Sequence, residues 1–205
     1  MKAPPVTERG RRTRAAIVTA AAELMHRHGL AGPSIDDVLA ASGTGKSQLY
    51  HYFDSRQDLA AAVLYHQFDR VMESQPALHD PACADLRAWR DQVLAAHRDS
   101  GYGTCPLGAF VGQVDDEPEL RSILAELFDR WAGSLAGLVM RARDDGRVRS
   151  DIYPDDAGGM LLAALEGGTI LAHLHRQSAP LERSLDSAIV ALTAKDASIV
   201  HSQSD

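Results

Sequence analysis

The sequence predicts an all-α protein of about nine helices. Along nearly the whole chain, apolar residues recur three and four positions apart, which is the period of amphipathic helices. Helix start signals and Gly or Pro stop signals separate these segments. No segment shows a convincing alternation of apolar and polar residues, the pattern of a β-strand. Hydrophobic residues make up 45% of the 205 residues, which is enough to build a folded core.

The first predicted helices are short and closely spaced. Residues 11–28 form the first. Ser34 and Asp37 have the spacing of a capping box, in which the hydroxyl caps a helix and the acid reaches back, and they open a helix that ends at about residue 41. After a turn of about four residues, a second short helix covers residues 46–52. Two short helices joined in this way are typical of a helix-turn-helix motif.

The later helices are longer and follow similar start signals. Ser55 and Asp58 form another capping box, and the pair Asp80-Pro81 places a proline at a first helical position. Residues 100–108 read as a loop. The remaining helices are predicted over about residues 118–144, 154–176 and 180–194.

Charge is distributed unevenly along the chain. The net charge is −7, yet residues 1–56 hold eight Lys and Arg against five Asp and Glu. A basic N-terminal part on an acidic remainder can steer one end of a molecule toward a polyanion.

Several classes of protein are disfavoured by composition. No uncharged apolar run reaches the length of a membrane span, and the N-terminus lacks the apolar stretch of a secretory signal. Cys83 and Cys105 form no disulfide or metal framework, which favours a reducing cytoplasm. The His-x-His pairs at residues 26–28 and 173–175 point apart on a helix, so we expect no metal site, and we expect no cofactor.

The stretch SGTGKS at residues 42–47 allows an alternative from another class. Gly45-Lys46-Ser47 match the end of a phosphate-binding loop, and a nucleotide-binding enzyme would use them for that purpose. However, the first glycine of that pattern is replaced by Ala40, and a capped helix precedes the stretch where a buried strand is required. The helix-turn-helix interpretation accounts for the same residues, so we expect no enzyme.

Residues 11–59 resemble the N-terminal domain of TetR/AcrR-family transcriptional regulators. The similarity is carried by Ser34-Ile35, Val38, Ala40, Ser42-Gly43, Leu49-Tyr50, Tyr52-Phe53, Ser55-Arg56 and Leu59. It implies a helix-turn-helix domain over residues 7–54 and a ligand-sensing and dimerisation domain over residues 55–196. Thr44-Gly45 replaces the usual Val-Ser of the family turn, which could alter operator preference.

The resemblance also implies roles for individual residues. Tyr50 and His51 would bond backbone phosphates, while Ser47 and Gln48 would read bases, since Gln can pair with adenine. The full set of expected DNA-binding residues is Ser34, Thr44, Gly45, Lys46, Ser47, Gln48, Tyr50, His51 and Arg56. In this family the arginines near the N-terminus can form an arm that reaches a neighbouring groove.

The C-terminal part is similar, more weakly, to the branch of LmrA- and YxaF-like regulators. This similarity implies a small, mostly apolar effector, with candidate contacts at Trp89, Cys105, Phe110, Trp131, Met140, Glu166 and His173. Glu166 could bind a ligand cation, bond His173 or Thr169, or lie on a dimer axis. Cys105 could be a redox sensor or a buried inert thiol.

Residues 158–174 are apolar on nearly every face, and such a helix must be buried. We expect it to pair with the last helix in a four-helix bundle across a two-fold axis. The expected dimer contacts are Leu161, Leu165, Ile170, Leu174, Leu185, Ile189 and Leu192. The sequence thus predicts a cytoplasmic homodimer that binds a near-palindromic operator as a ligand-responsive repressor. An activator, or a regulator without an effector, stays open.

Overall fold

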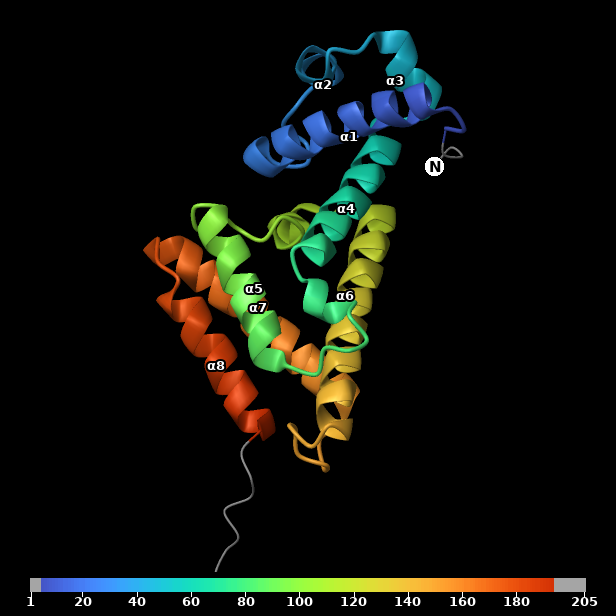
Figure 1. Ribbon diagram of the computed structural model, residues 1–205. Coiled ribbons are helices and arrows are strands. Elements are labelled where there is room, and N and C mark those ends of the chain that lie inside the picture. The colour runs from blue at the N-terminus through green and yellow to red at the C-terminus, as the bar shows by residue number, and fades with distance from the viewer. Residues whose placement is uncertain (1–4, 194–205) are drawn as a thin grey trace, which may run out of the picture. The chain divides into compact units, whose positions relative to one another are not determined.

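The computed structural model describes residues 5–193, and every regular element in that range is a helix (Figure 1). The all-α prediction is therefore confirmed. The helices are α1 (Glu8–His28), α2 (Ile35–Ser42), α3 (Lys46–Tyr52), α4 (Arg56–Glu73), α5 (Leu86–Asp99), α6 (Pro118–Asp144), α7 (Pro154–His175) and α8 (Ala179–Thr193), with short 3₁₀ helices η1 (Pro76–Leu78) and η2 (Gly108–Gln113). The expected helix end at residue 194 and domain end at residue 196 lie outside the described residues.

The chain folds into two compact units. The head unit comprises Met1–Gln75 and Gly103–Trp131, and the core unit comprises Pro76–Tyr102 and Ala132–Asp205. α6 therefore contributes its first half to the head unit and its second half to the core unit. The predicted division into residues 7–54 and 55–196 concerns function, and it stays a prediction.

The starts of the head helices follow their capping residues. α1 begins at Glu8, three residues before the predicted start, because the Thr7 hydroxyl accepts the Gly10 N–H at 3.1 Å. The predicted capping box of α2 is confirmed: Ser34 Oγ accepts the Asp37 N–H at 3.1 Å, and Asp37 Oδ2 accepts the Ser34 N–H at 2.8 Å. The Ser34 hydroxyl, 2.7 Å from Asp37 Oδ2, and then the Ser34 N–H donate to the Asp37 carboxylate and hold its pKa below its usual range.

The head core lies where α1 crosses α4, with α2 and α3 packed against α1 (Figure 1). Ile17 of α1, Leu49 of α3 and Leu59 of α4 are at most 1% exposed. At the end of α2, Gly43 adopts φ 64°, a left-handed conformation that favours glycine. The helix-turn-helix therefore rests on a small apolar core, and its polar residues are left on the outside.

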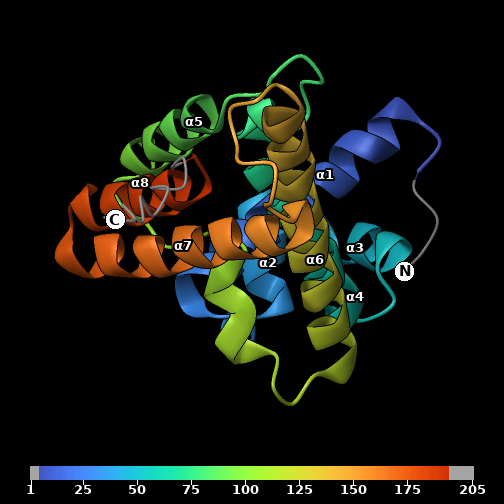
Figure 2. The ribbon, with the colours of Figure 1, turned by 90° about the horizontal axis from the view of Figure 1, so that it is seen from below.

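The core unit is built on the pair α7 and α8, which lie side by side in both ribbon views (Figures 1 and 2). α5 packs against α8, where Arg90 donates to Asp186 at 3.0 Å and to Glu182 at 2.7 Å. A Cβ on Gly168 would lie 2.9 Å from Leu181 Cα, so the glycine permits the close approach of α7 and α8.

One predicted helix start is wrong. The pair Asp80-Pro81 does not open α5, which begins five residues later at Leu86. Asp85 is the cap, since its Oδ1 accepts the N–H groups of Arg87 and Ala88 at 2.8 and 3.3 Å. Pro81 lies in the preceding turn.

α7 is long and apolar enough to cross a membrane by length and composition alone. However, 44% of its most apolar window is buried within the chain, and core helices of soluble proteins pass the same test. It gives only weak evidence for a membrane span.

Candidate functional site

The outer face of α3 is polar and exposed. The helix is anchored by Leu49, which is 1% exposed, and its residues on the other side turn to solvent. The exposed residues are Lys46, Ser47, Gln48, Tyr50 and His51. Together they offer an ammonium, two hydroxyls, an amide and an imidazole, which are groups that bond phosphates and base edges. All five were predicted from the sequence as DNA contacts.

Gln48 has a second task that the sequence did not reveal. Gly45 precedes α3 and has no side chain with which to cap it. Gln48 Oε1 accepts the Gly45 N–H at 3.0 Å, which is the return half of a capping box and fixes the start of α3. A bidentate pair with adenine uses both amide atoms of the glutamine, and the second lone pair of Oε1 and the amide nitrogen are the groups it would need.

The turn before α3 is held by its own hydroxyls. Ser42 Oγ and Thr44 Oγ1 are 2.7 Å apart and share a hydrogen bond. Thr44 is half-buried, whereas Gly45 is exposed. The polar Thr44 therefore finds a partner where the family usually places an apolar valine.

The two expected phosphate contacts outside α3 are also bonded within the chain. Ser34 is exposed, with its Oγ 2.7 Å from Asp37 Oδ2. Arg56 is half-buried, and its Nη2 donates to the Leu30 carbonyl at 2.9 Å. Part of the Arg56 guanidinium thus holds the α1–α2 turn.

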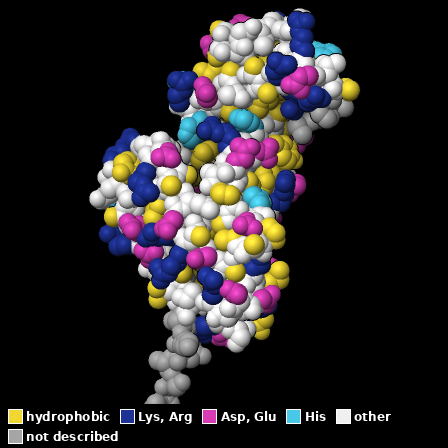
Figure 3. All heavy atoms as spheres, viewed as in Figure 1, with side chains coloured by type: hydrophobic (Ala, Val, Ile, Leu, Met, Phe, Trp, Pro, Cys, Tyr) yellow, Lys and Arg dark blue, Asp and Glu magenta, His cyan; other side chains and the backbone are white. Residues whose placement is uncertain are grey.

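The arginines near the N-terminus lie on α1 itself. Arg11 and Arg12 pair with Glu8 at 2.9 and 3.2 Å, and the Arg14 guanidinium lies 5.2 Å from the Phe53 ring centroid. Lys and Arg side chains are visible at the surface over α1 to α3 in Figure 3, beside a few acidic ones. Within the described residues, these three arginines belong to a helix and form no extended arm.

The surroundings of Gly45-Lys46-Ser47 do not fit a phosphate-binding loop. Such a loop connects a strand to a helix. Here α2 precedes the turn and Gly45 is the cap of a seven-residue helix. The structure therefore gives no support to the nucleotide-binding alternative.

The expected effector residues are divided between the two units. Cys105, Phe110 and Trp131 lie in the head unit, and each is at most 8% exposed. Trp89, Glu166 and His173 lie in the core unit with Met140. Met140 on α6 is 47% exposed, which disfavours it as a contact in an enclosed pocket. Burial of Cys105 favours an inert thiol, and its Sγ accepts the Gly108 N–H at 3.2 Å.

Sequence analysis missed three buried polar side chains beside these residues. Gln75, two residues after the end of α4, accepts the Trp131 Nε1–H at 3.4 Å, and Gln67 within α4 is 2% exposed. His97 on α5 is 7% exposed, and burial lowers its pKa, assisted by the nearby His173. The signal in the sequence was an amide or imidazole at a position where the helical period places an apolar residue.

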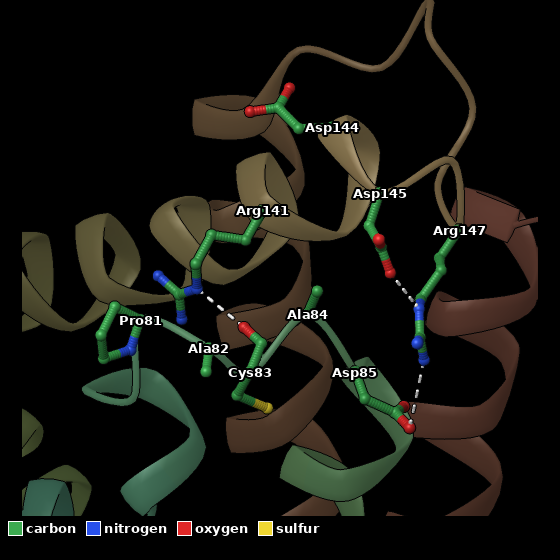
Figure 4. A pocket seen from close by; sticks show the side chains of 9 residues that line it. All are labelled: Pro81, Ala82, Cys83, Ala84, Asp85, Arg141, Asp144, Asp145 and Arg147. Atoms are coloured by element: carbon green, nitrogen blue, oxygen red, sulfur yellow. Dashed lines mark hydrogen bonds and ion pairs between the residues drawn. The ribbon is translucent and has the colours of Figure 1, made fainter.

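A cavity of about 590 Å³ in the core unit lies between the loop before α5 and the end of α6 (Figure 4). Its arginines already face protein oxygens: Arg141 donates to the Cys83 carbonyl at 2.7 Å, and Arg147 to Asp145 at 2.6 Å. Asp85 lies 3.7 Å from Arg147. Because these arginines are bonded to protein oxygens, the cavity is better explained as a place where the loop is held against α6 than as a ligand site.

The predicted dimer contacts need a correction. Leu161, Leu165, Leu185, Ile189 and Leu192 are each at most 4% exposed, because they form the packing between helices of one chain. As placed, these five side chains offer almost no surface to another chain. Ile170 and Leu174 are 64% and 71% exposed and do reach the surface.

α7 carries an exposed apolar stripe that includes Ile170 and Leu174 of the predicted set. Met160, Ala163, Gly167, Ile170 and Leu174 recur three and four residues apart, and all are exposed. A Cβ on Gly167 would meet no atom within 4 Å, whereas Gly158 is packed against Ala132 and Ala136 of α6. The helix therefore has two apolar faces, one inside the chain and one outside.

Comparisons with known proteins identify the family. Residues 82–188 match the family described as "Tetracyclin repressor-like, C-terminal domain", and residues 17–63 match "Bacterial regulatory proteins, tetR family". An HTH-type transcriptional regulator of Mycobacterium tuberculosis is 31% identical over 180 residues, covering 81% of this chain and 87% of that protein. The HTH-type transcriptional repressor DhaR of a Mycobacterium species is 21% identical, covering 86% and 90%.

The fold agrees with that of solved regulators. The crystal structure of a regulatory protein TetR from Rhodobacter sphaeroides covers 88% of this chain and 98% of its own with a TM-score of 0.76 at 21% identity. The helix-turn-helix, the all-helical remainder and both family matches lead to one conclusion: the chain belongs to the TetR family of bacterial transcriptional regulators.

Proposed function

We propose that this protein is a homodimeric repressor that binds an operator through α3 and is released by a small effector. The observation that carries the proposal is the polar, exposed face of α3, opposite the buried Leu49. A helix of this kind enters the major groove with its N-terminal residues toward the bases. Because the proposed partner is operator DNA, the protein is proposed to act in the cytoplasm.

Roles within the interface follow from position and chemistry. Lys46, Ser47 and Gln48 occupy the first turn of α3 and are the proposed base readers, with Lys46 also within reach of phosphate. Tyr50 and His51 are exposed further along and bond phosphates. Thr44 and Gly45 directly precede α3, and Ser34 at the start of α2 and Arg56 at the start of α4 complete the proposed set.

The exposed stripe of α7 is the proposed dimer surface. Ile170 and Leu174 are large apolar residues with more than half of their surface in water, and exposed apolar patches mark association sites. Val190 of α8 is a further exposed apolar residue of the same helix pair, at 52%. Pairing of two such stripes across a two-fold axis gives two recognition helices suited to a near-palindromic operator.

The effector is proposed to be small and mostly apolar. Support comes from the aromatic content of the interior, where Trp89, Phe110 and Trp131 are at most 1% exposed. An effector releases DNA only if it binds the released state more tightly than the bound state.

The direct test selects tight-binding duplexes from a random-sequence pool with the purified full chain and then measures their affinity by fluorescence anisotropy. We expect recovery of near-palindromic sequences and tight binding that resists unrelated competitor DNA. Gln48→Ala and Lys46→Ala variants should bind them more weakly. Failure to enrich any sequence, with weak binding equal on all duplexes, would contradict the proposal.

A further inference from the structure

The turn between α1 and α2 is held on both sides by side chains from distant parts of the head unit. After α1 ends, Gly29 adopts φ 83°, and Leu30 leaves the helical hydrogen-bond ladder. The Leu30 N–H donates to Gln113 Oε1 at 2.6 Å, and the Leu30 carbonyl accepts from Arg56 Nη2 at 2.9 Å. Both backbone polar groups of Leu30 are therefore fixed by side chains.

The amide of Gln113 can take only one orientation. Its Nε2 donates to the Ala109 carbonyl within η2 at 2.7 Å, so its oxygen is directed to Leu30. A Cβ on Gly29 would lie 3.0 Å from that oxygen, and the glycine leaves room for it. A carboxylate at position 113 would meet the Ala109 carbonyl as a second acceptor. Glutamine is thus matched to both partners.

A second polar bridge lies close to the first. Gln57 in the first turn of α4 donates to Glu117, just before α6, at 3.0 Å. Between the two bridges is a cavity of about 310 Å³ lined by Leu30, Arg56, Gln57, Gln113, Glu117 and Leu120, among others. The segment from η2 to the start of α6 is therefore bonded to the α1–α2 turn by Gln113 and to α4 by Glu117. Hydrogen bonds are directional, so these two contacts set orientation more than they add apolar packing.

We propose that Gln113 is a positioning residue for DNA binding. It lies in the stretch matched by the family's C-terminal domain, residues 82–188, yet it belongs to the same compact unit as α1 to α4. By fixing Leu30, four residues before the Ser34 cap, it sets the position of α2 and α3 relative to α1 and α4. A shift of η2 is thereby passed to the recognition helix. This inference rests on the proposed function.

A Gln113→Met variant tests the inference, since it keeps the length of the side chain and removes both hydrogen bonds. We expect amide hydrogen exchange at Leu30, resolved by NMR, to accelerate about tenfold, as loss of one hydrogen bond implies. Affinity for the selected duplex, measured well below the unfolding temperature, should fall about fivefold. Gln113 is exposed, so the loss of packing is small, and a purely structural role would lower the unfolding temperature without changing affinity.

The matched control is Val111→Ala, also exposed and also in η2, which should change neither readout. Unchanged exchange at Leu30, or faster exchange with affinity within twofold of the wild type, would overturn the inference and leave the proposed function standing. If the wild type itself bound no duplex specifically, the proposed function would fail and this inference with it.

Discussion

The exposed faces of α3 and α7 differ in chemistry, and the difference indicates different partners. α3 presents Lys46, Gln48 and Tyr50, which can form hydrogen bonds. α7 presents Ile170 and Leu174, which have no hydrogen-bonding groups in their side chains and are stabilised by burial away from water. The first face suits a polyanion with hydrogen-bonding edges, and the second suits another apolar surface. The chemistry of a helix face that stays exposed in one chain can thus indicate which kind of molecule binds there.

The largest expected effect comes from placing charge on the apolar face. A Ile170→Glu, Leu174→Glu variant should weaken dimerisation at least about 100-fold, because burial of each side chain contributes about 1.5–3 kcal/mol. Operator affinity should fall with it. Sedimentation equilibrium measures the association. The control Met140→Glu changes another exposed apolar residue, on α6, and should leave the dimer intact. A dimer unaffected by the double change would remove the α7 stripe from the interface.

Changes on the polar face should weaken DNA binding and spare the dimer. Loss of a base contact at Gln48→Ala should cost about 1–3 kcal/mol of operator affinity. For Lys46→Ala, the slope of log affinity against log salt concentration should also decrease by about one. Anisotropy titrations at several salt concentrations measure both. Arg98→Ala removes an exposed cation from α5 in the core unit as the charge-matched control. An unchanged salt slope for Lys46→Ala would mean that this ammonium does not contact phosphate.

Substitution of two glycines by alanine tests the difference in packing between the inner and outer sides of α7. Gly168→Ala should lower the free energy of unfolding by about 1–3 kcal/mol, because the new methyl meets the backbone of Leu181. Gly159→Ala should raise it by about 0.5–1 kcal/mol, since nothing lies within 4 Å and alanine favours the helix. Urea titration at fixed protein concentration measures both. Equal effects would show that α7 has no tightly packed inner side.

The smallest expected effect is a dependence of stability on pH. Burial lowers the pKa of His26, His66 and His97 from the ordinary value of 6.5. Between pH 6.5 and 5 the unfolded chain therefore binds more protons at these histidines than the folded chain does. The free energy of unfolding is largest above pH 6.5 and decreases as pH falls below 6.5 toward 5. His97→Gln should flatten this decrease in urea titrations at pH 5–7. A wild-type stability that rose with acidification would contradict the assignment.

The sequence predicted the head in more detail than the core unit, for physical reasons. Capping residues, the Gly43 turn and the buried Leu49 are local signals, and they determine which side of α3 is exposed. Residues 158–174 are apolar on nearly every face, so the helical period could not tell Leu161, packed inside, from Ile170, exposed outside. The start of α5 was misplaced because two acids, Asp80 and Asp85, could each cap it.

Contacts between distant parts of the chain left no local signal. The bond between Gln113 and Leu30 joins residues 83 positions apart, and only the fold brings them together. The effector residues were chosen by type, and the fold divides them between two units and exposes Met140. The amides of Gln67 and Gln75 were overlooked because a glutamine on a helix is most often at the surface.

The most direct measurement combines both faces in one sample: the mass of the complex on a selected duplex, by sedimentation, for the wild type and the Ile170→Glu, Leu174→Glu variant. If α3 reads DNA and α7 pairs the chains, the wild type binds as two chains per near-palindromic site, and the variant binds weakly as single chains. One wild-type chain per duplex, with the variant bound as tightly, would contradict the proposed dimeric repressor.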